Sequence, residues 1–167
     1  GPEKVWCFHA PASRRKIMPG DPVGVDLCGV YNRYHSNQCR YFSVGEPDPK
    51  FADKYAKGTK AMHKVKEIIR PNMLVDDFLN EMMKFYEEEG ILGEQYWIGG
   101  YELGISFPPD WVGEFVYDPY LNNEGARFEP GMVVNFETGF GIIDTIIFTE
   151  DEAKIVGTTT WDLQIVE

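Results

Sequence analysis

Two helix-forming segments, with strand-forming segments on both sides of them, constrain the fold of this chain most. A first helix is expected from Pro49 through Ile69, because Asp48 can act as its N-cap and proline fits the first helical turn. A second is expected over residues 75–89, where apolar side chains recur at helical spacing and Gly90 suits the C-terminal cap. This order of segments predicts an α+β domain with a mainly antiparallel sheet.

The predicted strands are short segments rich in β-branched and aromatic residues. Three precede the helices, at residues 22–28, 30–34 and 38–44, and three follow them, at residues 132–139, 145–150 and 163–166. The intervening segment is rich in glycine, proline and aromatic residues, which is typical of loops that carry function. No linker or repeat divides the chain, so residues 1–167 are expected to form a single domain.

Composition excludes several classes of function. A formal net charge of -11 would repel a nucleic-acid backbone, so no nucleic-acid partner is expected. No apolar run approaches the roughly 20 residues of a bilayer span, and no export signal is recognised at Gly1. Cys7, Cys28 and Cys39 are odd in number and form no CxxC motif, which favours buried structural cysteines over a disulfide framework. A cytoplasmic protein without a membrane partner is therefore expected.

Four segments carry a resemblance to a known family. In chain order they are residues 20–26 (GDPVGVD), 100–105 (GYELGI), 129–137 (EPGMVVNFE) and 144–150 (DTIIFTE). Together they resemble the metal-binding motifs of the pita-bread superfamily, which contains methionine aminopeptidases, prolidases and creatinases. The resemblance implies a curved sheet with helices on one face. It also implies a truncated domain, because family members carry a further segment before the position of His9. A surface left open in this way would need covering, so a homodimer is expected.

The resemblance also assigns the positions of metal ligands. In metal-dependent members, two aspartates, one histidine and two glutamates hold two divalent ions. The matching positions here, in chain order, are Asp26, Asn37, Tyr101, Glu137 and Ile143, unless a short gap brings Asp144 into the last of them. Hard divalent ions need several anionic oxygens, so neither a metal nor another cofactor is expected.

Two further segments point to a branch of the superfamily. Phe8-His9-Ala10-Pro11 resembles the His-x-Pro segment of creatinases, which work without metal, and this likeness makes His9 a general acid/base. In metal-dependent members a histidine at this place merely contacts substrate, and that alternative stays open. Residues 100–104 with residues 107–111 (FPPDW) resemble the ectoine hydrolase branch. That likeness implies an aromatic wall of Tyr101, Phe107 and Trp111, with loop packing as the alternative role.

The expected function is metal-independent hydrolysis of a C–N bond in a small amidine, guanidine or zwitterionic compound. His9 would activate water and Glu137 would hold the substrate cation and return a proton, while Asp26, Asn37 and the aromatic wall would bind substrate. Two alternatives remain at this point. One is a non-catalytic binding module, for which lost ligands are equally expected, and the other is a peptidase of the Xaa-Pro type that keeps one metal ion.

Overall fold

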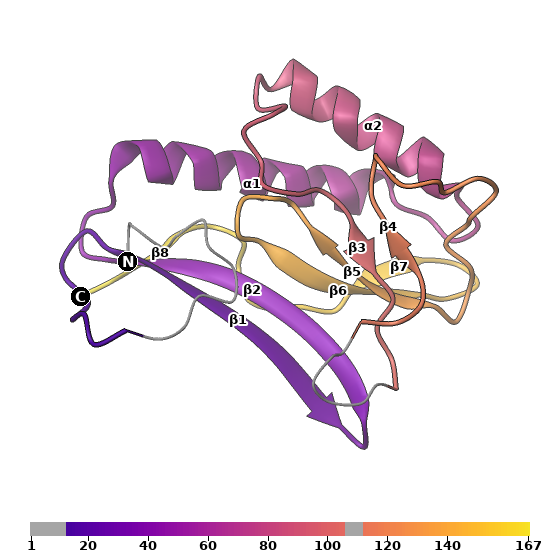
Figure 1. Cartoon of the computed structure of the whole chain (residues 1–167), viewed down its shortest axis with the longest axis horizontal. Helices are drawn as coiled ribbons and strands as arrows, with labels where there is room; N and C mark the ends of the chain where they lie inside the picture. The colour runs from indigo at the N-terminus through magenta and orange to yellow at the C-terminus, as the bar shows by residue number, and fades with distance from the viewer. Residues whose placement is uncertain (1–12, 106–111) are drawn as a thin grey trace.

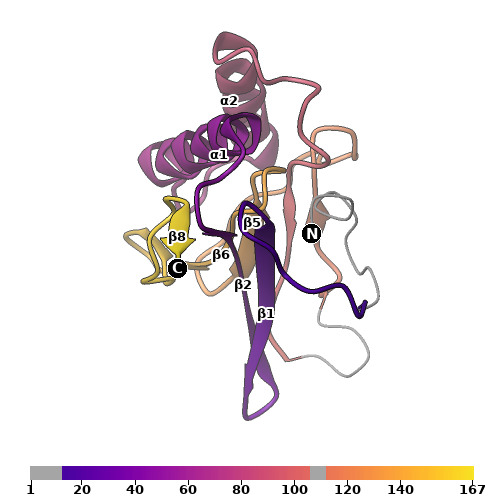
Figure 2. The ribbon, with the colours of Figure 1, turned by 90° about the vertical axis from the view of Figure 1, so that its left-hand side faces the viewer.

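Two helices cover one face of a curved, mainly antiparallel sheet (Figures 1 and 2). The computed structural model describes residues 13–105 and 112–167. The elements are β1 (Pro22–Tyr31), β2 (Tyr34–Val44), α1 (Pro49–Ile68), α2 (Val75–Glu88), β3 (Gly100–Tyr101), β4 (Val116–Tyr117), β5 (Val133–Glu137), β6 (Ile143–Phe148), β7 (Ala153–Ile155) and β8 (Gln164–Val166). In the described part of the chain, neither helix combines the length and apolar character needed to span a membrane. The predicted α+β class is confirmed.

β1 and β2 form one long hairpin that extends beyond the rest of the sheet (Figure 1). The sequence predicted a break between strands at Gly29, and that prediction was wrong. Gly29 pairs with Ser36 inside an uninterrupted antiparallel register, because a glycine at an exposed strand position weakens a ladder without ending it. The chain instead turns at Asn32 and Arg33, whose φ angles of 50° and 69° fit a tight hairpin turn.

The strand order of the sheet brings the first hairpin and the last strands of the chain together. The path is β1-β2-β6-β5, with β7 added beside β6 and β8 added parallel to β2. β6 begins at Ile143, two positions before the predicted start, and this places both Ile143 and Asp144 within a strand. β3, β4 and β7 were not predicted, since they are only two or three residues long.

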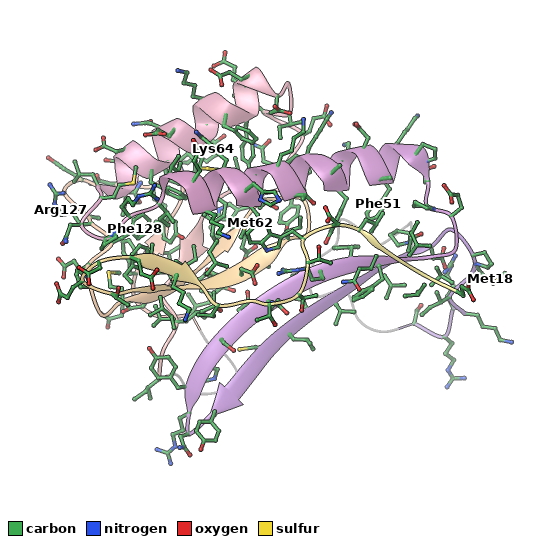
Figure 3. The ribbon with its side chains drawn as sticks, turned by 180° about the vertical axis from the view of Figure 1, so that it is seen from behind. Met18, Phe51, Met62, Lys64, Arg127 and Phe128 are labelled. Atoms are coloured by element: carbon green, nitrogen blue, oxygen red, sulfur yellow. The ribbon has the colours of Figure 1, made fainter. Side chains whose placement is uncertain are left out.

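The core lies between the helices and the sheet. Asp48 caps α1 by accepting hydrogen bonds from the backbone amides of Lys50 and Phe51, as its residue type predicts. Met62 of α1 and Phe128 lie in the layer between the helices and the strands (Figure 3). Phe128 is one of several fully buried aromatic side chains that meet edge to face in this layer. Burial of large apolar side chains therefore holds the helices to one face of the sheet.

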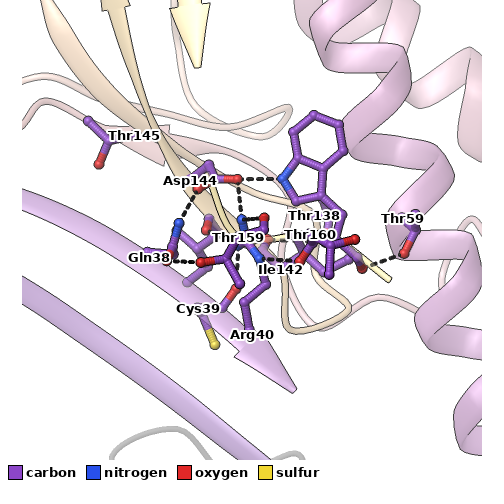
Figure 4. A network of polar contacts seen from close by, with 12 residues as sticks. Gln38, Cys39, Arg40, Thr59, Thr138, Ile142, Asp144, Thr145, Thr159 and Thr160 are labelled. Carbon is purple, nitrogen blue, oxygen red and sulfur yellow. Dashed lines mark hydrogen bonds and ion pairs between the residues drawn. The ribbon is translucent and has the colours of Figure 1, made fainter. Parts of the chain in front are cut away.

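A buried ion pair joins strands β2 and β6. An Arg40 guanidinium nitrogen of β2 lies 2.7 Å from a carboxylate oxygen of Asp144 in β6, and both side chains are almost fully buried. Asp144 also accepts hydrogen bonds from Gln38 and from the Trp161 indole (Figure 4). Arg40 also donates hydrogen bonds to several backbone carbonyl oxygens, among them that of Thr159. Both charges are thus fully engaged.

The packing of β3 against β5 depends on Gly100. β3 runs along β5, and a Cβ at Gly100 would overlap the carbonyl oxygen of Asn135 and lie 2.5 Å from the Tyr117 hydroxyl. That hydroxyl donates a hydrogen bond to the same carbonyl at 2.6 Å. Only glycine allows this close approach without displacing backbone.

Gly100→Ala is expected to lower the free energy of unfolding by about 1–3 kcal/mol, because the new methyl group has no room beside β5. Urea unfolding followed by circular dichroism measures the change. Gly29→Ala is the matched control, since a Cβ there meets only the Ser36 hydroxyl oxygen at 3.1 Å on an exposed strand. Equal losses in the two variants would contradict the close packing of β3 on β5.

Asp144→Ala is expected to lower the free energy of unfolding by about 3–5 kcal/mol, because it leaves the Arg40 charge buried without its partner. The control is Glu88→Ala, which breaks the exposed Lys84–Glu88 pair and is expected to cost less than about 1 kcal/mol. The same urea titration compares the two variants. A loss no larger than that of the control would show that the Arg40 charge is solvated.

Candidate functional site

The face of the sheet opposite the helices collects the residues assigned to a site. Asp26 pairs with Cys39, Cys39 with Ile143, and Ile143 with Glu137, across four adjacent strands. Directly paired residues of antiparallel strands point to the same face, so these four side chains form one row. Core residues such as Phe136 alternate with them and face the helices. The strand register therefore brings two distant carboxylates into the same row.

A second row of polar side chains runs beside the first. Asn37 pairs with Cys28, and Asn135 pairs with Thr145. The Thr145 hydroxyl accepts a hydrogen bond from the Asn37 backbone amide and donates one to its carbonyl, both at 2.9 Å. Thr145 thus links β2 to β6 where the two strands lack regular pairing. This second row lies next to the carboxylates and supplies hydrogen-bond donors to them.

Two buried amides connect the two carboxylates. The Asn37 Nδ2 group donates to Asp26 Oδ1 at 3.1 Å, and its own oxygen accepts from Asn135 Nδ2 at 3.3 Å. Asn135 Nδ2 also lies 3.3 Å from Glu137 Oε1. The structure therefore brings the predicted residues Asp26, Asn37 and Glu137 together in one hydrogen-bonded network.

Tyr101 reaches this network from β3. Its backbone amide donates to Asn135 Oδ1 at 2.8 Å, and its side chain forms a hydrogen bond to the Glu137 carboxylate. Tyr101 therefore lies at the site, as the resemblance implied. The contact that the structure shows is a hydrogen bond, and stacking on a ligand stays a prediction. The other two members of the predicted wall, Phe107 and Trp111, lie outside the described residues, as does His9.

The environment of Glu137 changes its proton affinity. Burial, and to a smaller extent the neighbouring Asp26 carboxylate, raise the pKa of Glu137 from 4.5 to about 7, while hydrogen bonds from Asn135 and Tyr101 act in the opposite direction. At neutral pH the carboxylic acid and the carboxylate are therefore both populated. A group of this kind can accept and release a proton under physiological conditions.

Asp144 does not complete a ligand set at this site. It adjoins Ile143 in a strand, so the two side chains point to opposite faces, and Asp144 is held in the ion pair with Arg40. The alternative in which a short gap brings Asp144 into the last glutamate position was therefore wrong. Ile143, an apolar residue, stands between Cys39 and Glu137 in the first row.

The residues of the site do not fit the two-metal centre of the superfamily. Of the five ligand positions, only Asp26 and Glu137 carry a carboxylate, and the others hold an amide, a phenol and an aliphatic side chain. Across residues 13–105 and 112–167, no group of three or more His, Cys, Asp or Glu side chains is arranged to hold a metal ion. Two carboxylates and two amide donors suit a small cationic ligand better than a pair of divalent ions.

Reasoning from the sequence missed three residues of the site. Asn135 and Thr145 each share a strand face with an assigned position, two residues away, and that spacing could have indicated them. Tyr96 carries no such signal. Burial raises the pKa of its hydroxyl, with a smaller contribution from Glu137, which places Tyr96 near the carboxylates. His35 Nδ1 lies 3.1 Å from the Gly104 carbonyl oxygen.

Glu137→Gln is expected to remove a pH dependence of stability. Because the folded protein raises the pKa of Glu137, this group contributes stability that is fully present below pH 4.5 and is lost as the pH rises to about 7. The free energy of unfolding of the wild type, relative to Glu137→Gln, should therefore fall across this interval. Urea titrations of both proteins at several pH values measure the difference, with the exposed Glu129→Gln as control. A constant difference would place the Glu137 carboxyl in solvent.

Comparisons with known proteins agree with this fold. Residues 1–158 match the model of metallopeptidase family M24. The Xaa-Pro dipeptidase of Pyrococcus furiosus is 30% identical over 159 residues, which cover 93% of this chain and 45% of that protein. The ectoine hydrolase of Halomonas elongata is 27% identical over 140 residues, which cover 78% of this chain and 34% of that protein.

A solved structure gives the same result at the level of the fold. The dipeptidase from Pyrococcus horikoshii superposes with a TM-score of 0.83 at 20% identity, over 98% of this chain and 46% of that one. The chain thus spans less than half the length of these relatives. The family match, the relatives and the observed sheet confirm the resemblance, and the chain belongs to metallopeptidase family M24, with the pita-bread fold.

Proposed function

We propose that this chain supports hydrolysis of a C–N bond in a small amidine, guanidine or zwitterionic compound without a bound metal, and that Glu137 transfers the proton. The observation that carries this proposal is the pair of carboxylates, Asp26 and Glu137, joined by amides where the superfamily's metal centre needs five ligands. The similarity to an ectoine hydrolase is consistent with a compound of this class.

The charge of the site favours a cationic ligand. Asp26 and the ionised form of Glu137 present two negative charges in one row of the sheet, and an amidinium or guanidinium group can donate paired hydrogen bonds to carboxylates. Tyr101 and Tyr96 both lie near Glu137 and can offer aromatic surface to such a ligand. A planar cation is therefore the ligand chemistry that this arrangement suits best.

The proton affinity of Glu137 suits the reaction. As a carboxylate, Glu137 can take a proton from a water molecule while the oxygen of that water bonds to the substrate carbon. As a carboxylic acid, it can return that proton to the nitrogen when the C–N bond breaks. A pKa of about 7 keeps both forms accessible at neutral pH. His9 stays a second candidate for this role, assigned by the resemblance.

Peptidase activity of the Xaa-Pro type is the second candidate function. The observation that favours it is the 30% identity to an Xaa-Pro dipeptidase over nearly the whole chain. The observation against it is the donor set, in which an amide, a phenol and an isoleucine stand at three ligand positions. A third possibility, a binding module without catalysis, would keep the carboxylate pair and show no turnover.

Turnover assays with ectoine, creatine and an Xaa-Pro dipeptide, each with a chelator or with added Mn²⁺, separate these functions. We expect hydrolysis of an amidine or guanidine compound that the chelator does not change. Glu137→Gln should slow it by about 10²–10⁴-fold, because the variant cannot transfer a proton. Glu129→Gln, which changes an exposed carboxylate outside the site, should leave the rate unchanged.

Other outcomes of these assays would contradict the proposal. Dipeptide hydrolysis that requires a stoichiometric metal ion would establish the peptidase function instead. Calorimetric binding of guanidinium without turnover of any compound would establish the binding module.

A His9→Ala variant with full activity would remove the role assigned to His9 and leave Glu137 as the proton-transfer group.

A further inference from the structure

The amide network of the site has a defined direction. It begins at the backbone N–H of Tyr101, which donates to Asn135 Oδ1 at 2.8 Å. A backbone amide can only donate, so this contact fixes which end of the Asn135 side chain is oxygen and which is nitrogen. The nitrogen must then face the site. β3, which is held against β5 through Gly100, thus sets the orientation of a buried side chain.

From Asn135 the network divides between the two carboxylates. One branch runs from Asn135 Nδ2 to Glu137 Oε1 at 3.3 Å. The other runs from the same nitrogen to Asn37 Oδ1 at 3.3 Å, and from Asn37 Nδ2 to Asp26 Oδ1 at 3.1 Å. Each carboxylate therefore accepts a hydrogen bond from an amide, and Asn135 takes part in both branches.

Burial makes this arrangement depend on Asn135. Its side chain is 0% exposed and that of Asn37 is 2% exposed, so solvent cannot replace a lost donor at either position. Buried polar groups left without a partner are costly, and networks of this kind hold a single orientation only while every member is satisfied. Thr145 bonds to the Asn37 backbone, whereas the Asn37 side-chain amide contacts Asn135, Asp26 and, at 3.5 Å, the Leu27 carbonyl oxygen.

We propose that Asn135 is a positioning residue that orients Glu137 and, through Asn37, Asp26, so that the two carboxylates act on one ligand. The identity of the ligand in this inference rests on the proposed function, which gives a planar cation as the group to be held. Its geometric part is independent, because it states only that Asn135 determines the orientation of the Asn37 amide. The two parts can be measured separately.

The main test replaces Asn135 with aspartate. Asn135→Asp keeps the shape of the side chain but turns its donor into an acceptor, which would face Asn37 Oδ1 and Glu137 Oε1. Asn123→Asp is the matched control. Asn123 is also buried, 6% exposed, and its Nδ2 donates to a carboxylate, that of Asp76, at 3.1 Å, in the loop that follows β4. Asn135→Ala serves if the aspartate variant does not fold.

Two readouts decide the test. The first is calorimetric affinity for guanidinium and acetamidinium, used as probes of the site. The second is the ¹⁵N–¹H resonance of the Asn37 side-chain amide. We expect Asn135→Asp to weaken probe binding at least about tenfold, the scale of one hydrogen bond to a charged group, and to shift the Asn37 resonance. Asn123→Asp should change neither, even if its melting temperature falls as far.

The outcomes separate this inference from the proposed function. If the wild type binds neither probe, the proposed ligand class fails, and the Asn37 resonance still decides the positioning role. An unchanged Asn37 resonance in both Asn135 variants overturns the inference, whatever the affinity. Equal effects of Asn135→Asp and Asn123→Asp on the resonance also overturn it, since they would reflect general loss of stability. A shift confined to the Asn135 variants supports it.

Discussion

The antiparallel register of β1, β2, β6 and β5 is the constraint on which the rest of this structure depends. Because side chains alternate along each strand, one register gives the sheet an apolar face for the helices and a polar face for the site. A slip of one residue in β6 would exchange Ile143 and Asp144 between the two faces. It would place an unpaired carboxylate beside Glu137 and remove the partner of Arg40. The buried ion pair and the site thus depend on the same register.

The two faces of the sheet also hold their charged groups in two different ways. On the helix face, Arg40 and Asp144 neutralise each other and every donor is engaged, which suits a structural role. On the site face, Asp26 and Glu137 carry like charges, and amide donors offset only part of their repulsion. A raised proton affinity at Glu137 follows directly. The group suited to proton transfer, Glu137, therefore lies on the face where like charges are only partly offset.

Membership of metallopeptidase family M24 fixes the fold more firmly than the chemistry. The named relatives include an Xaa-Pro dipeptidase and an ectoine hydrolase, two different kinds of hydrolase. In this chain the positions that distinguish metal chemistry hold Asn37, Tyr101 and Ile143. Asn37 and Tyr101 form a hydrogen-bonded network with Asn135 and the two carboxylates.

The sequence by itself determined the local features. The N-cap at Asp48, the helix end near Gly90 and the residue types at the ligand positions follow from local chemistry or from motif order. Only the tertiary structure decided which face Asp144 occupies, that β1 and β2 form a single hairpin, and that Asn135 belongs to the site. The reason is physical: Asn37 and Asn135 are 98 residues apart, and their contact exists only once the strand register is set. The alternation of apolar and polar residues limits the register of each strand, but it does not identify the distant strand that pairs with it.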